Sequence, residues 1–465
     1  MKRAKSIKTT AETMKISIDQ IDADGVGQGR YQGQPVSVPG AFPKEIVLAA
    51  IEHRGQHRIA GQLLKVLRRN PQRRASSACN CASDCLGCPL INLSYQGQLD
   101  FKRQRVLAAL RENGLAETPV EAPLAADPTM GYRTSCKLVV ARERNGVKIG
   151  LYRRGSHQVV GIEDCPLHHP LINRIVKVVA DEIGRQQIPI YNPKRQRGLL
   201  RYLLIRVSPQ SGKAMVTFVS REQDLRFLPK LGKWLQRKVP EVIAVHQNIN
   251  SSTGNVVIGG KTLKLHGQPD LFDRIGNIRL RISPTSFFQV NHQQATRVYQ
   301  MIREWADLDD SQSALDLYCG VGGISLHLAQ DAGQVFGIEV VDEAVRNARA
   351  NAELNQLKNC VFRAGDAIIE LQKLAGELPS LALACLNPPR KGCDKEVLQA
   401  MGELAPEQII YMSCEPTSLA RDLVILTRLG YRINRVQPVD MFPQTAHVET
   451  LVQLYRTETA SFPDI

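Results

Sequence analysis

The sequence predicts an α/β protein in three parts: a small β-barrel at the N-terminus, a β-rich centre, and a C-terminal open sheet, mainly parallel, with helices on both faces. Three observations predict this. Short strands broken by glycine occupy residues 13–70, β-rich stretches dominate from about 130 to 265, and strands alternate with helices from about 285. With 465 residues, the chain is also too long for a single hydrophobic core.

The N-terminal segment is typical of a small closed barrel. Residues 14–18 alternate apolar and polar side chains, residues 25–30 supply glycine turns, and residues 35–40 form another short strand between breakers. About five such strands in about 60 residues favour a barrel over residues 8–72. A cationic stretch, residues 65–74, ends it.

Charge is unevenly distributed along the chain. The net charge is +15, but residues 1–240 carry +21 and the remainder carries −6. A basic half favours a polyanionic partner, and nucleic acid is preferred to membrane phosphate because no basic amphipathic helix with bulky apolar anchors stands out. No uncharged apolar run approaches the ~20 residues of a bilayer span, and no apolar signal segment follows the basic N-terminus. We therefore expect a cytoplasmic protein without membrane contact.

A cysteine-dense segment follows the barrel. Cys79, Cys81, Cys85 and Cys88 lie close together, and Cys165 lies far downstream. Eleven cysteines in a reducing compartment favour metal binding or catalysis over disulfides. Three closely spaced thiolates and one distant ligand suit an iron–sulfur cluster, while a four-cysteine site is also typical of structural zinc. Cys81 leaves a local tetrad without Cys165 as an open alternative.

The remaining elements follow from periodicity. Residues 95–114 have a helical pattern, and basic β-rich stretches such as 137–140 and 202–207 follow. Farther on, strands are expected over 314–317, 334–338, 360–362 and 381–386, with helices over 324–330 and 341–354. This alternation predicts the open, mainly parallel sheet.

Polar groups follow three of these strands. A glycine-rich turn, residues 316–323, joins the first strand to a helix and lets a ligand approach the backbone closely. Glu339 ends the second strand, where a carboxylate can accept hydrogen bonds from ribose hydroxyls. Asp366 closes the third and could reach an adenine amino group. This order resembles the pattern of S-adenosylmethionine-dependent methyltransferases.

Cys414 lies in a loop between an apolar run and a helix-like stretch. A polar loop, residues 387–392, lies upstream of it, and the glycine-rich turn lies farther upstream. A lone cysteine is most often a buried small hydrophobe. A thiol in a strand-end loop beside cofactor and substrate loops instead indicates covalent catalysis.

Six ordered motifs resemble those of the RNA uracil-C5 methyltransferase family over nearly the whole chain. They are the barrel, similar to a TRAM domain; the cysteines at 79, 85, 88 and 165; and the segments 286–291, 387–392, 413–416 and 442–449. The resemblance is strongest to the TRAM-bearing enzymes of 23S ribosomal RNA. It implies a Rossmann-like methyltransferase sheet at the C-terminus and a central domain with a cysteine-ligated cluster.

The resemblance also implies domain bounds and site residues. It implies a TRAM-like RNA-binding barrel over 8–72, a central iron–sulfur and RNA-binding domain over 73–94 and 121–280, and a methyltransferase domain over 95–120 and 281–465. It implies Cys414 as nucleophile, Glu449 as proton acceptor, a 4Fe-4S cluster (zinc being the alternative) on Cys79, Cys85, Cys88 and Cys165, and S-adenosylmethionine held by Gln289, Tyr318, Gly323, Glu339, Asp366 and Asn387.

The implied reaction is methylation of C5 of a specific uridine in 23S ribosomal RNA by a monomer with no obligate protein partner. Uracil C5 is a poor nucleophile, so a thiolate first adds to C6, and a base later removes the C5 proton. The target base should be unstacked or flipped out of the RNA.

The sequence departs from the family pattern at two points. Glu415 stands where the family has asparagine, and a carboxylate beside a thiol opposes thiolate formation unless it is paired, with Arg421 or Arg390 as expected partners. Gly323 and Asn387 resemble the branch of ribosomal enzymes without a TRAM domain. A non-catalytic RNA-binding paralogue and an enzyme acting on transfer RNA therefore remain alternatives.

Overall fold

The computed structural model describes residues 12–457, except residues 86, 144–145, 154–155, 255, 287 and 378–379. The chain divides into two compact units. The first contains residues 1–101, 153–155 and 442–447, and the second contains the rest. The chain passes from the first unit to the second within helix α1 (Tyr95–Glu112).

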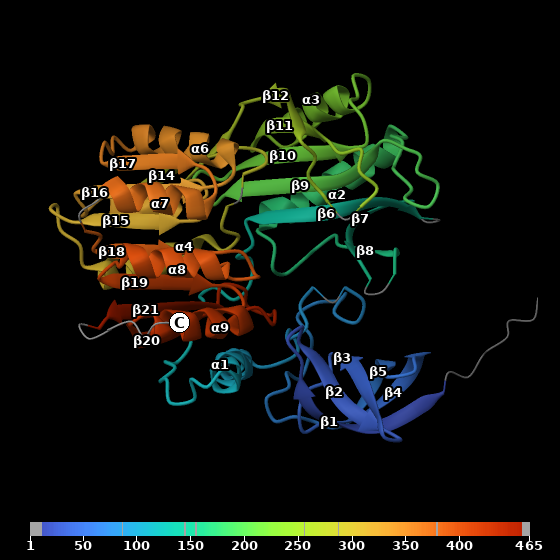
Figure 1. Cartoon of the computed structure of the whole chain (residues 1–465). Helices are drawn as coiled ribbons and strands as arrows, with labels where there is room; N and C mark the ends of the chain where they lie inside the picture. The colour runs from blue at the N-terminus through green and yellow to red at the C-terminus, as the bar shows by residue number, and fades with distance from the viewer. Residues whose placement is uncertain are drawn as a thin grey trace, which may run out of the picture. The chain divides into compact units, whose positions relative to one another are not determined.

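The first unit is built on a closed five-stranded barrel, which confirms the sequence prediction (Figure 1). Met14, Ile16 and Ile18 alternate inward and are buried, as the two-residue period of a strand requires. Gly29 lets neighbouring strands approach closely, because a Cβ there would lie 2.2 Å from the Ser17 carbonyl oxygen. The barrel order is β1-β2-β3-β5-β4, formed by β1 (Thr13–Ile21), β2 (Val26–Tyr31), β3 (Gln34–Pro39), β4 (Ile46–Arg54) and β5 (Ile59–Arg68).

The second unit contains a mixed sheet built from the β-rich centre of the sequence. Helices α2 (Pro170–Arg185) and α3 (Leu228–Lys238) pack against this sheet. Its order is β12-β11-β10-β9-β6-β7-β8, formed by β6 (Ser135–Glu143), β7 (Gly146–Tyr152), β8 (Val159–Gly161), β9 (Leu200–Ser208), β10 (Lys213–Ser220), β11 (Val242–Ile249) and β12 (Lys261–Gly267). A two-stranded hairpin, β13 (Leu271–Ile275) and β14 (Ile278–Ile282), follows it along the chain.

The C-terminal sheet of the second unit is the doubly covered α/β sheet that the sequence predicts. Five neighbouring strands are parallel, and the last two strands of the chain add an antiparallel edge. The order is β17-β16-β15-β18-β19-β21-β20, formed by β15 (Ser313–Leu317), β16 (Gln334–Glu339), β17 (Cys360–Ala364), β18 (Leu383–Leu386), β19 (Gln408–Ser413), β20 (Tyr431–Val439) and β21 (Glu449–Arg456). The expected strands at 314, 334, 360 and 381 are therefore present.

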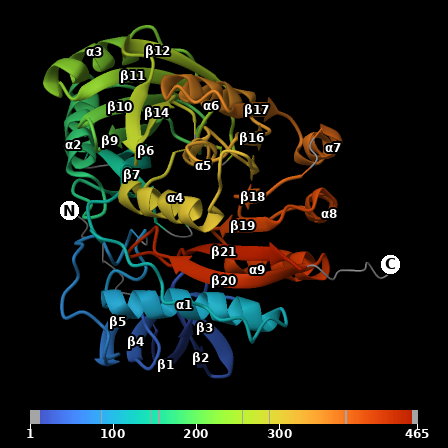
Figure 2. The ribbon, with the colours of Figure 1, turned by 90° about the vertical axis from the view of Figure 1, so that its left-hand side faces the viewer.

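Helices cover both faces of this sheet. Figure 2 shows α4 and α5 on one side of the strands and α7 and α8 on the other. The helices are α4 (His292–Ala306), α5 (Gly323–Leu328), α6 (Asp342–Leu354), α7 (Ala367–Glu377), α8 (Lys395–Leu404) and α9 (Pro416–Arg428). None of the described helices combines the length and the apolar composition that crossing a bilayer requires.

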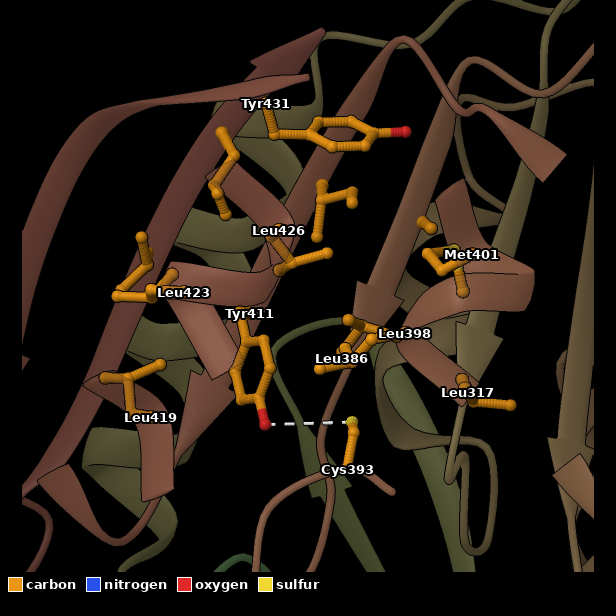
Figure 3. Close-up of a cluster of buried hydrophobic side chains, with 14 of the residues drawn as sticks. Leu317, Leu386, Cys393, Leu398, Met401, Tyr411, Leu419, Leu423, Leu426 and Tyr431 are labelled. Atoms are coloured by element: carbon orange, nitrogen blue, oxygen red, sulfur yellow. Dashed lines mark hydrogen bonds between the residues drawn. The ribbon is translucent and has the colours of Figure 1, made fainter. Parts of the chain in front are cut away.

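Side chains from β18, β19, α8 and α9 form part of the hydrophobic core beneath one face (Figure 3). Leu386, Leu398, Leu419 and Leu423 are at most 1% exposed. Each buried leucine contributes about 1.5–3 kcal/mol of transfer free energy. This core fixes the strand ends from which the loops of the candidate site emerge.

Candidate active site

The glycine-rich loop between β15 and α5 forms one wall of a pocket. Tyr318, Gly320 and Gly322 all have positive φ, at +66°, +55° and +84°. A Cβ on Gly322 would also lie 3.2 Å from the Phe362 ring. Glycine is therefore favoured at position 322, both by the backbone conformation and by the packing.

The pocket collects residues that are distant in the sequence. Four of the six residues predicted to hold the cofactor line it: Gln289, Tyr318, Gly323 and Asn387. Its full lining is Leu280, Phe288, Gln289, Tyr299, Asp316, Tyr318, Cys319, Gly320, Val321, Gly323, Ile324 and Asn387. A pocket at the carboxyl ends of parallel strands is the usual place for a nucleotide-like ligand in an open α/β sheet.

Glu339 and Asp366 lie at the ends of β16 and β17 and are not among the lining residues of this pocket. Glu339 accepts hydrogen bonds from the backbone N–H of Gly320 at 3.1 Å and of Val341 at 2.9 Å. Asp366 accepts one from the Ile368 N–H at 2.9 Å, at the start of α7. Glu339 therefore braces the glycine-rich loop.

Asp316 is a pocket residue that the sequence analysis did not single out. It is fully buried on β15, and its Oδ2 accepts hydrogen bonds from the backbone N–H and the hydroxyl of Ser325, at 2.9 and 2.5 Å. Its Oδ1 is buried without a hydrogen-bond partner among the described residues. Burial raises the pKa of this carboxyl to about 7.

The unpartnered Oδ1 of Asp316 indicates which kind of ligand the pocket fits. A buried acceptor without a donor is costly, so a ligand that brings a donor is favoured there. S-adenosylmethionine carries an ammonium group and ribose hydroxyls, all of which are donors. The pocket therefore suits this cofactor, with Asp316 as an additional contact.

The strand register brings Cys414 and Glu449 to one edge of the sheet. In the antiparallel pair β19–β21, Ser413 lies opposite Thr450. Cys414 is the residue after Ser413 and Glu449 the residue before Thr450, so both lie at the same end of this strand pair. Two residues that are 35 positions apart in the sequence are thus neighbours in the fold.

The environment of Cys414 disfavours the thiolate in the protein alone. The side chain is half-buried, and burial raises the pKa of the thiol to about 11. The carboxylates of Glu449 and, more weakly, Glu415 contribute to this rise of the pKa, and the guanidinium of Arg390 opposes it. Most of the thiol is therefore protonated at neutral pH.

Glu449 is buried at the start of β21, with 8% of its surface exposed. Burial raises the pKa of its carboxyl to about 7, and Arg390 opposes that shift. A carboxyl with a pKa near neutrality suits a general base, because it is ionised often enough and still binds a proton readily.

Arg390 lies in the polar loop that follows β18. It is exposed, and its backbone carbonyl accepts a hydrogen bond from the Ser418 hydroxyl at 3.0 Å. Its guanidinium lowers the pKa of both the Cys414 thiol and the Glu449 carboxyl. Its charge therefore favours the thiolate of Cys414.

Glu415 pairs with a residue that the sequence analysis did not consider. Its Oε1 lies 3.3 Å from Nη2 of Arg105 on α1. Arg421, one of the two expected partners, instead binds Asp422 through Nε and Nη2, at 2.8 and 2.6 Å. The expectation that Arg421 or Arg390 pairs with Glu415 is therefore wrong.

Buried hydrogen bonds among Tyr411, Asp422 and Cys393 hold the loop that carries Arg390. The hydroxyl of Tyr411 donates to Asp422 at 2.6 Å and lies 3.7 Å from the sulfur of Cys393 (Figure 3). Asp422 also accepts from the Cys393 N–H at 2.8 Å. Gly392 has φ +79°, and a Cβ there would lie 2.5 Å from Asp422 Oδ2. Strand β19, helix α9 and the loop after β18 are thus joined close in sequence to Cys414.

The cysteines predicted to hold a cluster lie in two separate parts of the chain. Cys79, Cys85, Cys88 and Cys165 are half-buried, as is Cys81. Across the described part of the chain, no three His, Cys, Asp or Glu side chains are arranged to hold a metal ion. Thiolates are the donors that both iron–sulfur clusters and structural zinc sites use.

Comparison with known proteins identifies similar chains. A family model described as tRNA (Uracil-5-)-methyltransferase matches residues 272–457. An uncharacterized RNA methyltransferase of Geobacter sulfurreducens is 45% identical over 448 residues, covering 96% of this chain and 90% of that protein. Another, of Bacillus cereus, is 34% identical over 448 residues, covering 96% and 97%.

A solved structure resembles this one over almost its whole length. It is the tRNA (uracil-54, C5)-methyltransferase of Pyrococcus abyssi in complex with S-adenosyl-L-homocysteine. The TM-score is 0.75 at 25% sequence identity, covering 95% of this chain and 100% of that one.

Proposed function

This chain belongs to the RNA uracil-C5 methyltransferase family, and from that membership we propose that it methylates C5 of one uridine in 23S ribosomal RNA through a covalent cysteine adduct. The single observation that carries the mechanism is the register of β19 and β21, which places Cys414 and Glu449 at one strand end. Arg390 acts on both groups. A nucleophile, a base and a cation are therefore available together.

Cys414 is the proposed nucleophile. Its thiolate attacks C6 of the uracil, and the electrons of the C5–C6 double bond move toward the ring carbonyl to give an enolate. Arg390 favours the thiolate by its charge. The pKa of about 11 means that the thiolate is a minor form at neutral pH.

S-adenosylmethionine, when bound, supplies an electrophilic methyl group on a sulfonium. Gln289, Tyr318, Gly323 and Asn387 line the pocket proposed for it, and Glu339 and Asp366 lie at the adjoining strand ends. Their role is to orient the methyl group toward C5 of the enolate. The pocket opens at the carboxyl end of the sheet, where Cys414 also lies.

Glu449 is the proposed base. It takes the proton from C5 after methylation, the electrons of that C–H bond re-form the C5–C6 double bond, and the thiolate leaves C6. After this step Cys414 is a free thiolate and Glu449 is protonated, so Glu449 releases the proton to solvent before the next turnover. The pKa of about 7 allows Glu449 to accept this proton near neutral pH.

The ribosomal target rests on the first half of the chain. Residues 1–240 carry +21, and the barrel within them resembles a TRAM domain. Such a surface suits an extended polyanion. Transfer RNA is a second candidate, because the matching family model and the similar Pyrococcus abyssi enzyme are both described as acting on it.

A 4Fe-4S cluster on Cys79, Cys85, Cys88 and Cys165 remains part of the proposal, with structural zinc as the alternative. Metal sites of this kind often form only when the metal binds, so the arrangement of the thiols alone does not decide it. An anaerobic absorbance spectrum distinguishes the two, because an iron–sulfur cluster absorbs visible light and zinc does not.

Mapping of 5-methyluridine tests the proposed function. Ribosomal and transfer RNA from cells with and without this protein should differ at one uridine of 23S RNA. Loss of a methyl group only in transfer RNA would move the target to the second candidate. No difference in either RNA would support a non-catalytic RNA-binding protein.

A further inference from the structure

Helix α1 carries two cationic side chains, Lys102 and Arg105, which pair with acidic residues of two other segments. Lys102 and Arg105 are three residues apart, so they lie on one face of the helix. Lys102 pairs with Asp440, and both side chains are fully buried. Arg105 pairs with Glu415, the residue after Cys414. One helix therefore contacts the nucleophile loop and the chain just after β20.

The backbone around Glu415 is fixed independently of its side chain. The Glu415 N–H donates to the Ser413 hydroxyl at 3.2 Å, and the Ser418 hydroxyl donates to the Glu415 carbonyl at 3.1 Å. Pro416 follows at the first position of α9. Ser413, Ser418 and Pro416 therefore fix the backbone of this loop. The carboxylate of Glu415 does not take part in these contacts.

Glu415 does not use its carboxylate in the way its position suggests. It occupies the N-cap of α9, with φ −139° and ψ 109°, yet it forms no side-chain capping hydrogen bond. A carboxylate at the start of a helix is normally drawn to the N–H groups of the first turn. Here it lies against Arg105 instead, with 31% of the Glu415 side chain and 13% of the Arg105 side chain exposed.

The direction of this carboxylate matters to Cys414. The charged groups that act on the thiol come from three elements: Glu449 on β21, Arg390 after β18, and Glu415 in its own loop. Glu449 and Glu415 disfavour the thiolate, and Arg390 favours it. Neutralising Glu415 removes one of the two opposing charges.

We propose that Arg105 is a positioning residue for the Glu415 carboxylate: its guanidinium draws this carboxylate off the start of α9 and partly neutralises the charge that opposes the Cys414 thiolate. The proposal rests on Cys414 being the nucleophile. It explains how this chain keeps a glutamate where a charge would otherwise oppose thiolate formation. The first turn of α9 is then free to stabilise the thiolate.

A charge cycle tests the proposal in the full-length protein. The variants are Arg105→Ala, Glu415→Gln and the two combined, with Arg111→Ala as the matched control, since Arg111 is an exposed arginine on the same helix. The measurement is the pH dependence of iodoacetamide alkylation at Cys414, followed by mass spectrometry of its peptide. The pH midpoint of alkylation reports thiolate formation, whereas a change in access to the sulfur alters the rate at every pH.

The expected pattern is reciprocal. Arg105→Ala should slow alkylation at mildly alkaline pH by about threefold, because a partly exposed charge pair has a modest effect. Glu415→Gln should leave the rate unchanged or raise it, and the double variant should return to the wild-type rate. The slowing should shrink in high salt, which screens the uncompensated carboxylate.

Three results would overturn the proposal: an unchanged pH profile in Arg105→Ala, a double variant as slow as the single one, or slower alkylation in Glu415→Gln. Thermal unfolding and S-adenosylmethionine binding report whether each variant is folded. If Arg105→Ala does not fold, Glu415→Gln and Arg105→Lys still decide the matter, since Arg105→Lys should keep the wild-type profile. Failure of the proposed function is seen separately, as full methyl transfer by Cys414→Ala.

Discussion

The loop of Cys414 and the cysteine segment 79–88 differ in how the fold arranges their functional side chains. Cys414 and Glu449, the proposed nucleophile and base, come together because Ser413 and Thr450 are paired in adjacent strands. The cysteines of the segment 79–88 lie outside helices and strands, and among the described residues no group of three His, Cys, Asp or Glu is arranged to hold a metal ion. The hydrogen-bonded register of two strands positions side chains even when no molecule is bound. Metal-binding side chains in irregular segments often take their final arrangement only when the metal binds.

The largest expected effect comes from removing the Cys414 thiol. Cys414→Ala should abolish methyl transfer to RNA, because it removes the thiol proposed to form the C6 adduct. Incorporation of a labelled methyl group from S-adenosylmethionine measures this. Cys360→Ala is the matched control, since Cys360 is another half-buried thiol of the same sheet, and its activity should be retained.

Replacing the base should give a smaller loss. Glu449→Gln should lower the rate of methyl transfer by about 10²–10⁴-fold, the usual range for a general base. The cysteine adduct should accumulate, since its C5 proton is not removed, and denaturing gels of protein with RNA should show it. Wild-type activity in this variant would assign the base to another residue.

The pH profile of wild-type methyl transfer follows from the same two groups. Burial raises the pKa of Glu449 to about 7, so the ionised base is lost as the pH falls through 7. The Cys414 thiol has a pKa of about 11, so the thiolate fraction grows as the pH rises toward that value. The rate should therefore increase from pH 6 to pH 9. A rate that is flat across this range would contradict these assignments.

The pocket gives a more moderate prediction. Asp316→Asn keeps the size of the side chain and removes its charge, so S-adenosylmethionine should bind about tenfold more weakly, as for the loss of a hydrogen bond to a charged group. Calorimetry measures the dissociation constant. Asp309→Asn changes an exposed aspartate before β15 and should bind as the wild type does. Unchanged affinity in Asp316→Asn would remove Asp316 from the site.

The smallest expected effect concerns the cysteine segment. Cys85→Ser should remove any visible absorbance of the anaerobically purified protein, while the alkylation rate of Cys414 should not change. This result would confirm that the two regions are independent in their chemistry. A simultaneous loss of Cys414 reactivity would show instead that the segment is needed to form the nucleophile loop.

The sequence predicted most of the C-terminal sheet because strand–helix alternation and strand-end motifs are local signals. Gln289, Tyr318, Gly323 and Asn387 line one pocket as their motifs suggested. The barrel was also predicted, from alternation and glycine spacing.

Other features of the site depend on contacts that no local pattern contains. Arg105 lies 310 residues from Glu415 in the sequence, and only the packing of α1 reveals it as the partner. The missing partner of Asp316 Oδ1 is a property of the buried pocket. A carboxylate in the glycine-rich turn was visible in the sequence, but its burial was not.

The central claim is that Cys414, placed by the β19–β21 register beside Glu449, forms the covalent bond to uracil. RNA containing 5-fluorouridine tests it most directly, because the enzyme cannot remove fluorine from C5 and the adduct persists. With S-adenosylmethionine present, the account predicts a stable protein–RNA adduct whose cross-linked peptide contains Cys414. A cross-link at a different residue, or folded protein that binds RNA and cofactor without any adduct, would contradict it.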